Sequence, residues 1–267
     1  VLSGLNENMP AAVQLFEKLL ADAQVNKEVY TNMTSDILKA RSDAKLNQGQ
    51  NFSRLMSFAM YGPKSPATNL LTEAELTNMN PQELVDRIHN QNSYKHRILY
   101  YGPSSSKDLL ATINQYHQVP AALKDIPAGN EYSYLETPVT KVLVAPYDAK
   151  QIYMAQISNL DKKYDPAIEP IRALYDEYFG GGMNSIVFQE MRETRGLAYS
   201  AWASIMPPSY LKYPYVLRTQ IATQNDKMID AVTTFNDIIN NMPESEAAFK
   251  LAKDGLTNQI GRASCRE

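Results

Sequence analysis

The stretch that decides the fold is Phe179–Met206, with the sequence FGGGMNSIVFQEMRETRGLAYSAWASIM. Three consecutive glycines follow its first residue: Gly180, Gly181 and Gly182. Glycine gives up the most backbone freedom on ordering, so three in succession do not lie inside a stable helix. They therefore predict a loop that needs either a positive φ or a very close approach of the backbone to a neighbouring element.

A helix, a tight turn and a strand are expected after this loop. Ser185 is a good N-cap, and apolar side chains one turn apart in residues 186–195 indicate a short helix. Gly196 stands where a glycine commonly ends a helix. In residues 198–206, Tyr, Ala, Ala and Ile at odd positions alternate with Ser, Trp and Ser, which is typical of a strand.

The composition excludes several classes of function. A hydrophobic content of 44% with 21% charged residues is ordinary for a globular protein. The net charge of -3 is spread along the chain, so nothing favours nucleic acid or an acidic membrane surface. No apolar run approaches the roughly 20 residues of a membrane-spanning helix. The compartment stays open: the bacterial periplasm is one option, and any signal peptide would lie upstream of Val1.

Metal-binding motifs are missing from the sequence. The single cysteine, Cys265, lies in a C-terminal GRASCRE segment of open origin, and a single cysteine forms neither an internal disulfide nor a cysteine metal site. His89, His96 and His117 do not fall at His-x-x-His, His-Glu-x-x-His or His-x-x-Glu-His spacing. We therefore expect three surface or partly buried histidines, and no metal ligand or cofactor in this chain.

The periodicity of apolar residues and the positions of proline and glycine divide the chain into two halves joined by a linker. Residues 119–140 carry three prolines and a glycine without a clear period, which is typical of a linker. In residues 1–118 we expect a strand at 97–101 and helices at 10–23, 27–45, 52–60, 81–91 and 107–117. Residues 48–51 are expected to break a helix. In residues 141–267 we expect strands at 141–145, 151–158, 198–206 and 215–222, and helices at 167–179, 186–195, 228–240 and 244–259.

The two ends of the chain repeat each other at an offset of 219 residues. Apolar side chains coincide at eight positions: Met9, Ala12, Val13, Phe16, Leu19, Leu20, Tyr30 and Ile37 fall on Met228, Ala231, Val232, Phe235, Ile238, Ile239, Phe249 and Leu256. Two generic amphipathic helix pairs would also align in part, but seldom with the spacing between the helices kept. Residues 1–45 and about 220–264 are therefore expected to be the same piece of two related modules, both incomplete in this chain.

The deciding stretch resembles a known family. Its glycine loop, its Phe-Gln-Glu-x-Arg-Glu-x-Arg-Gly helix end and its Leu-Ala-Tyr-Ser strand are similar to the C-terminal module of pitrilysin-type zinc metallopeptidases, which include mitochondrial processing peptidase and insulin-degrading enzyme. The resemblance implies an α+β fold with two related modules, each an antiparallel-rich sheet covered by helices. Residues 1–118 would be the second part of an inactive peptidase-like module and 141–267 the C-terminal module.

The resemblance also implies where the zinc is bound. Family members carry the metal in their first module, on a His-x-x-Glu-His helix and a distant glutamate. Counting back from the loop at 61–63 places that glutamate near Lys39 or Ala40, and neither side chain coordinates Zn²⁺. The chain thus resembles the non-catalytic half of a zinc endopeptidase. Zinc and all catalytic residues would belong to a partner half, in the same longer chain or in a separate subunit.

Within that half, Arg192 and Tyr199 resemble the arginine and tyrosine that hold the backbone of the peptide substrate. A guanidinium and a phenol donate hydrogen bonds to peptide carbonyls, and near a metal they also steady an oxyanion. The loop at 180–182 would approach the neighbouring module as the chamber closes. Glu190 and Glu193 could form an acid–base pair, but the arginines beside them favour a solvated charged face.

Other interpretations stay open from the sequence. Arg192 could be an exposed cation paired with Glu193, and Tyr199 could pack in the core of its own module. The whole chain could be a structural or assembly module, as in the respiratory-complex core subunits of the same family. It could also be an active half that lacks its metal helix. No serine has a histidine and an acid at the spacing of a known triad motif.

Overall fold

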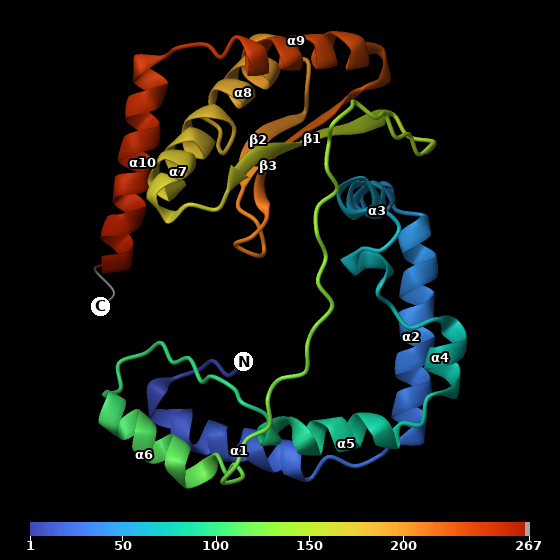
Figure 1. Ribbon diagram of the computed structural model, residues 1–267, viewed down its shortest axis with the longest axis vertical. Coiled ribbons are helices and arrows are strands. Elements are labelled where there is room, and N and C mark those ends of the chain that lie inside the picture. The colour runs from blue at the N-terminus through green and yellow to red at the C-terminus, as the bar shows by residue number, and fades with distance from the viewer. Residues whose placement is uncertain (265–267) are drawn as a thin grey trace. The chain divides into compact units, whose positions relative to one another are not determined.

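The computed structural model describes residues 1–264, and the predictions on Cys265 and the end of the GRASCRE segment lie outside the described residues. The chain forms two compact units, shown in Figure 1. Unit 1 consists of residues 1–43 and 70–131, and unit 2 of 44–69 and the described residues from 132 onwards. Residues 44–69 thus pack with the second unit, although in the sequence they lie between the two segments of the first unit. No helix among the described residues is long and apolar enough to cross a membrane.

Unit 1 is helical. The α1 helix packs against α5 and α6. Two of the helices have a side-chain N-cap: the Thr72 side chain accepts the Glu75 N–H at the start of α4, and the Ser105 side chain accepts the Asp108 N–H at the start of α6. The helices are α1 (Met9–Ala21), α2 (Lys27–Lys45), α4 (Glu73–Asn78), α5 (Gln82–Asn90) and α6 (Ser106–Tyr116).

The prediction of a strand at 97–101 is wrong. These residues form no ladder, and the described part of unit 1 holds a single isolated bridge, between Tyr94 and Lys124. An extended apolar run becomes a strand only where a neighbouring strand accepts its backbone hydrogen bonds. Ile98 and Leu99 instead lie exposed.

Unit 2 combines a three-stranded antiparallel sheet with helices. Its strands are β1 (Gln151–Lys163), β2 (Ser200–Met206) and β3 (Pro214–Gln224), in the order β1-β3-β2. The helices are α3 (Gln48–Tyr61), α7 (Glu169–Phe179), α8 (Ile186–Phe188), which continues as a π-helix (Gln189–Thr194), α9 (Met228–Asn240) and α10 (Glu246–Ser264). The α+β class is therefore confirmed for this unit.

Two further expectations for unit 2 are wrong. Residues 141–145 form no strand, for the reason that applies to 97–101: they have no ladder partner. Residues 48–51 begin α3 and do not break a helix, because the Asn47 side chain accepts the Gln50 N–H at 2.9 Å and caps the new helix.

The core of unit 2 lies between one face of the sheet and the helices. Ala201 on β2 pairs with Ile221 on β3, and both are buried. They pack with buried side chains of α7, α8, the π-helix, α9 and α10, including Phe179, Val187, Met191, Phe235 and Ala252. The small alanines leave room for the helices to approach the sheet closely.

The repeat extends to the boundaries of the elements. Moving α1 (Met9–Ala21) by 219 residues gives the bounds of α9 (Met228–Asn240), and moving α2 (Lys27–Lys45) gives those of α10 (Glu246–Ser264). Each pair is also preceded by a short 3-10 turn at the same offset, Asn6–Asn8 and Asn225–Lys227. Chance similarity of two amphipathic helices does not preserve both ends of three successive elements, so the internal repeat is a property of the structure.

The two copies differ in what covers them. Phe235 and Ile238 of α9 are 0% and 3% exposed, whereas the matching Phe16 and Leu19 of α1 are 36% and 63% exposed. In unit 2 these side chains enter the core beneath the sheet. The described residues of unit 1 provide no sheet, so the same helix face remains open to solvent.

Candidate functional site

Arg192 and Tyr199 lie on either side of a tight turn whose backbone is fully engaged. Gly196 adopts φ 56°, the left-handed region that favours glycine. The N–H groups of Leu197 and Ala198 both donate to the Met191 carbonyl, at 2.8 and 3.2 Å. The Tyr199 N–H donates to the Ala222 carbonyl at 2.8 Å, which begins the pairing with β3. The turn therefore fixes the backbone from which the Tyr199 side chain projects.

The helix that carries Arg192 is anchored by its opposite face. Ser185 caps it, with its hydroxyl accepting the Phe188 N–H at 3.4 Å, and Val187 and Met191 are both 0% exposed. The helix widens to a π-helix over Gln189–Thr194, a form that often occurs at functional sites. Because Val187 and Met191 point into the core, Arg192 is left at the surface.

The Arg192 guanidinium lies over two aromatic rings. Its Cζ is 5.0 Å from the centre of the Phe188 ring and 5.6 Å from that of Tyr199, within the range of cation–π attraction. Its Nε is 3.6 Å from the Glu193 carboxylate, a loose ion pair. The structure thus brings Arg192 and Tyr199 together, and it also contains the Glu193 pairing that the sequence left as an alternative.

Tyr199 is not a core residue. Its side chain is 70% exposed, while Ala201 and Ala203, two and four residues further along the same strand face, are 5% and 0% exposed. The core-packing alternative is therefore wrong for the tyrosine ring. An exposed phenol beside an exposed guanidinium offers hydrogen-bond donors to a ligand at the surface.

The glutamates near Arg192 are engaged with arginines. Glu190 Oε2 is 3.4 Å from Arg195 Nε, and Glu193 pairs with Arg192. Three of these four side chains are 44–53% exposed, and Glu190 is 30% exposed. This arrangement is the solvated charged face expected from the sequence.

The glycine loop approaches elements of its own unit. A Cβ on Gly180 would fall closer than 3.0 Å to the backbone of Ala203 on β2, and one on Gly181 would lie 2.7 Å from the Asp176 carbonyl oxygen of α7. Gly180 has φ -142°, so close approach, and not a positive φ, is the reason for glycine here. Gly182 is less confined, with Glu177 Oε1 at 3.6 Å. Approach of this loop to a neighbouring module stays a prediction.

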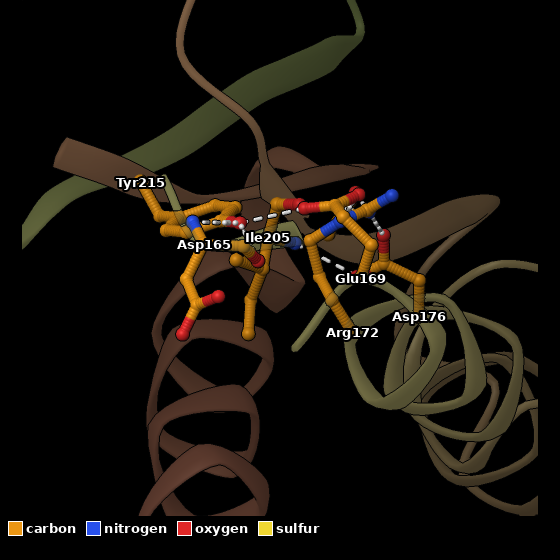
Figure 2. Close-up of polar contacts among 7 residues, drawn as sticks. Asp165, Glu169, Arg172, Asp176, Ile205 and Tyr215 are labelled. Atoms are coloured by element: carbon orange, nitrogen blue, oxygen red, sulfur yellow. Dashed lines mark hydrogen bonds and ion pairs between the residues drawn. The ribbon is translucent and has the colours of Figure 1, made fainter. Parts of the chain in front are cut away.

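A polar network docks α7 to the sheet, as Figure 2 shows. Asp176 accepts the Ile205 N–H at 2.8 Å and the Arg172 Nη1–H at 2.7 Å. Arg172 also binds Glu169 at 3.0 Å, and Glu169 accepts the Tyr215 hydroxyl at 2.6 Å. Through Asp176 the network satisfies the Ile205 N–H of β2 and ties α7 to that strand.

Burial and hydrogen bonding shift the carboxylates of this network in opposite directions. The Tyr215 hydroxyl, assisted by Arg172, holds the pKa of Glu169 below its ordinary value. Burial raises the pKa of Asp176, and its hydrogen bonds and Arg172 only partly offset that effect. Both pKa shifts follow from the packing and hydrogen bonding that dock α7 to the sheet, because every member of the network is bound to another member.

Arg218 on β3 is a candidate site residue that no sequence pattern indicated. Its Cζ lies 5.1 Å from the centre of the Trp202 ring, and its Nη2 donates to Gln220 at 3.3 Å. Its Nε is buried without a hydrogen-bond partner among the described residues, and burial lowers its pKa. Ser204 pairs with Arg218, and Trp202 with Gln220, so this group lies on the sheet face away from Ala201 and Ala203. The one available signal was a cation inside the strand expected at 215–222.

The structure also brings together His96 and His117, which no sequence pattern paired. Their Nε2 atoms are 2.8 Å apart in unit 1. Their separation of 21 positions corresponds to no local motif, so only the tertiary fold reveals the pair. Among the described residues, no group of three or more His, Cys, Asp or Glu side chains is placed to hold a metal ion. Lys39 and Ala40 lie exposed on α2.

Comparison with solved structures shows the same fold. The chain aligns over 99% of its length with 64% of a peptidase M16 inactive domain from Pseudomonas fluorescens, at 17% identity and a TM-score of 0.65. It aligns over 96% of its length with 28% of the periplasmic protease PqqL from Escherichia coli, at 14% identity and a TM-score of 0.68. The ferredoxin protease FusC, solved as an E83A mutant in complex with Arabidopsis ferredoxin, gives 12% identity, the same coverages and a TM-score of 0.63.

The chain therefore spans less than two thirds of the length of each of these proteins. No curated protein matches it by sequence. The model of one protein family, described as the peptidase M16 inactive domain, matches residues 98–256, which is more than half of the chain and includes the glycine loop, Arg192 and Tyr199. The chain belongs to the peptidase M16 inactive-domain family.

Proposed function

We propose that this chain is the non-catalytic half of a zinc-dependent endopeptidase, which closes the peptide chamber and holds the substrate backbone through Arg192 and Tyr199. The observation that carries the proposal is the exposed pair itself, presented on a turn whose N–H groups at 196–199 all donate to backbone carbonyls of the same unit. Binding groups held on rigid elements lose little entropy when a ligand docks.

The chemistry of the pair fits an extended peptide. The guanidinium donates but does not accept hydrogen bonds, and the tyrosine hydroxyl donates as well. Peptide carbonyls are acceptors in every sequence, so this pair would hold the backbone and not a particular side chain. Stacking of Arg192 on Phe188 and Tyr199 orients the guanidinium plane before the peptide arrives. Each hydrogen bond from a charged donor contributes about 1.5–3 kcal/mol.

The metal would come from elsewhere. Neither Lys39 nor Ala40 on α2 is a zinc ligand at the place where the family resemblance expects a glutamate. We therefore assign zinc and the catalytic residues to a partner half of the peptidase, in the same longer chain or in another subunit. The similar structure of FusC, a ferredoxin protease, was solved in complex with ferredoxin, which supports a polypeptide as the class of substrate.

The open face of α1 supports a larger assembly. Phe16 and Leu19 are exposed, whereas Phe235 and Ile238 of the repeated helix α9 are buried beneath a sheet. Exposed apolar side chains at positions that are core in the related copy are expected where further polypeptide packs. The proposal therefore treats this chain as one part of a multi-module peptidase.

Binding of a fluorescent peptide to the intact peptidase tests the proposal, with turnover blocked by substitution of the catalytic glutamate in the partner half. We expect Arg192→Ala to weaken binding at least tenfold and Arg195→Ala, a matched cation on the same helix, to leave it within twofold. Equal affinity of the Arg192→Ala variant and the parent protein would contradict the proposed clamp.

The second candidate is a structural or assembly module without a role in proteolysis. It is favoured by the contacts of Arg192 inside its own unit, with Phe188, Tyr199 and Glu193. Under this candidate, Arg192→Ala lowers the stability of unit 2 and leaves peptide affinity unchanged. The binding experiment and a thermal melt of the same variant separate the two functions.

A further inference from the structure

The geometry points to a transition-metal site formed by His96 and His117 in unit 1, a site separate from the Arg192–Tyr199 pair of unit 2. The two Nε2 atoms face each other at 2.8 Å, and the rings are nearly perpendicular, with an interplanar angle of 88°. His117 lies at the end of α6, and His96 follows the short turn after α5.

The other nitrogen of each ring faces an oxygen acceptor. His117 Nδ1 is 2.8 Å from the Glu17 carboxylate, and His96 Nδ1 is 2.6 Å from the Tyr94 carbonyl oxygen. An ionised carboxylate and a backbone carbonyl only accept hydrogen bonds, so each Nδ1 is the protonated nitrogen of its ring. In neutral rings, both Nε2 atoms then carry lone pairs. Two lone pairs directed at one another at this distance repel, unless a proton or a metal ion lies between them.

This pattern is the one that metal-binding histidines show. A ligating histidine commonly donates its second ring N–H to a carboxylate or a backbone carbonyl, which fixes the tautomer and the orientation of the ring. Both rings meet this condition, one with each kind of acceptor. Glu17 is itself held, because Asn92 Nδ2 donates to its second oxygen at 2.9 Å. The His117 and Glu17 side chains are only 12% and 18% exposed.

The spacing of the pair needs little adjustment. Two imidazoles bound to one tetrahedral ion at about 2.0 Å have their nitrogens about 3.3 Å apart. His96 is exposed, so its ring can move outward by about half an ångström. Imidazole nitrogens suit Zn²⁺, Ni²⁺ and Cu²⁺. Because no third protein ligand converges among the described residues, water would complete the coordination.

Such a site would tie together three segments of unit 1: the helix α1 through Glu17, the segment at 92–96, and the end of α6. Its role is to stabilise that packing, since a site with two protein ligands in unit 1 is not the zinc centre of the proposed peptidase. A metal site here would replace the expectation that this chain has no metal ligand, and it would form whether or not Arg192 and Tyr199 bind peptide.

Titration calorimetry of the full chain with Zn²⁺ alone tests the site, in a Cys265→Ser background that removes the only thiol. We expect one ion per chain, with affinity lowered at least tenfold by His96→Ala and by His117→Ala. His89→Ala is the matched control, because His89 lies exposed on α5 away from the pair, and it should leave the affinity unchanged. Glu17→Gln should weaken binding about tenfold by loosening the His117 ring.

Thermal unfolding of the same proteins gives a second readout. Zn²⁺ should raise the unfolding midpoint of the parent chain by several degrees, EDTA should reverse the rise, and the His96→Ala chain should show no rise. The metal-free His96→Ala chain should melt near the metal-free parent, because His96 is exposed. The site is refuted if Zn²⁺ does not bind, if it binds equally to the His96→Ala chain, or if size exclusion shows that the ion bridges two chains.

Discussion

The backbone of Gly180 lies directly against that of Ala203, where the glycine loop meets the strand β2. A Cβ on Gly180 would come closer than 3.0 Å to the backbone nitrogen and carbonyl carbon and oxygen of Ala203, which belong to a rigid sheet. We therefore expect Gly180→Ala to lower the free energy of unfolding by about 2–3 kcal/mol, the usual effect of overpacking. Urea denaturation measures this loss.

Gly182→Ala is the matched control for the same loop. A Cβ there would meet only the flexible end of Glu177, at 3.6 Å, so the change should stay within about 0.5 kcal/mol. Equal destabilisation by the two substitutions would show that loop entropy, and not contact with β2, explains the glycines.

The polar network around α7 predicts a pH dependence of stability. The pKa of Glu169 is lowered from 4.5 in the folded chain, mainly by the Tyr215 hydroxyl. Its stabilising contribution is therefore complete above pH 4.5 and is lost as the pH falls through the lowered folded pKa. We expect Glu169→Gln to destabilise unit 2 at pH 7 and to do so progressively less as the pH falls below 4.5.

Asp176 acts in the opposite sense, because burial raises its pKa from 3.8 and the neighbouring Glu169 charge adds to that rise. The difference in unfolding free energy between the Asp176→Asn chain and the Asp176→Asn/Glu169→Gln chain, measured from pH 7 to pH 3, therefore isolates Glu169. In a Tyr215→Phe background most of the pH dependence of that difference should disappear. A difference that does not change with pH would contradict the assignment.

The internal repeat supplies a matched pair of phenylalanines. Phe235 is 0% exposed and Phe16, at the equivalent position of α1, is 36% exposed. Phe235→Ala should cost about 3–5 kcal/mol, as in other buried sites, and Phe16→Ala about 1 kcal/mol or less in this chain. In the intact multi-module peptidase the cost of Phe16→Ala should rise towards that of Phe235→Ala. A cost that stays equally small there would show that nothing packs on α1.

Helices and the repeat could be predicted from sequence, because their signals are local or periodic. The spacing of apolar side chains located α1, α2 and α9, and Gly196 marked the turn before β2 correctly. The segments 97–101 and 141–145 have the same apolar character as a strand but lack a partner, and a partner is not encoded locally. The structure thus separates strand propensity from strand formation.

The candidate site could be predicted only where one short stretch contains it. Arg192 and Tyr199 are seven residues apart, so a motif recorded both, although it did not show that the Tyr199 ring is exposed. Arg218 and Trp202 are close because their strands, β3 and β2, pair with each other, and His96 and His117 are close because of the packing of unit 1. Contacts of this kind depend on register and tertiary packing, which single-sequence patterns do not specify.

Tyr199→Phe removes the hydroxyl of Tyr199 and keeps its ring, so it tests the contribution of the hydroxyl alone. The ring is exposed and its backbone bond to Ala222 is unchanged by the substitution, so the unfolding free energy should shift by less than about 0.5 kcal/mol. In the intact peptidase, kcat/KM for a peptide substrate should fall about tenfold or more through loss of one hydrogen bond. A loss of stability without a loss of kcat/KM would assign Tyr199 a structural role.

The most direct test of the central claim is the kinetics of Arg192→Ala in the intact zinc peptidase, measured together with its zinc content. If this chain holds the peptide for a metal bound elsewhere, kcat/KM should fall about ten- to a hundredfold, corresponding to a loss of about 1.4–2.8 kcal/mol, while the zinc content stays at the level of the parent enzyme. Unchanged kcat/KM, or a fall that follows a loss of zinc, would contradict the account.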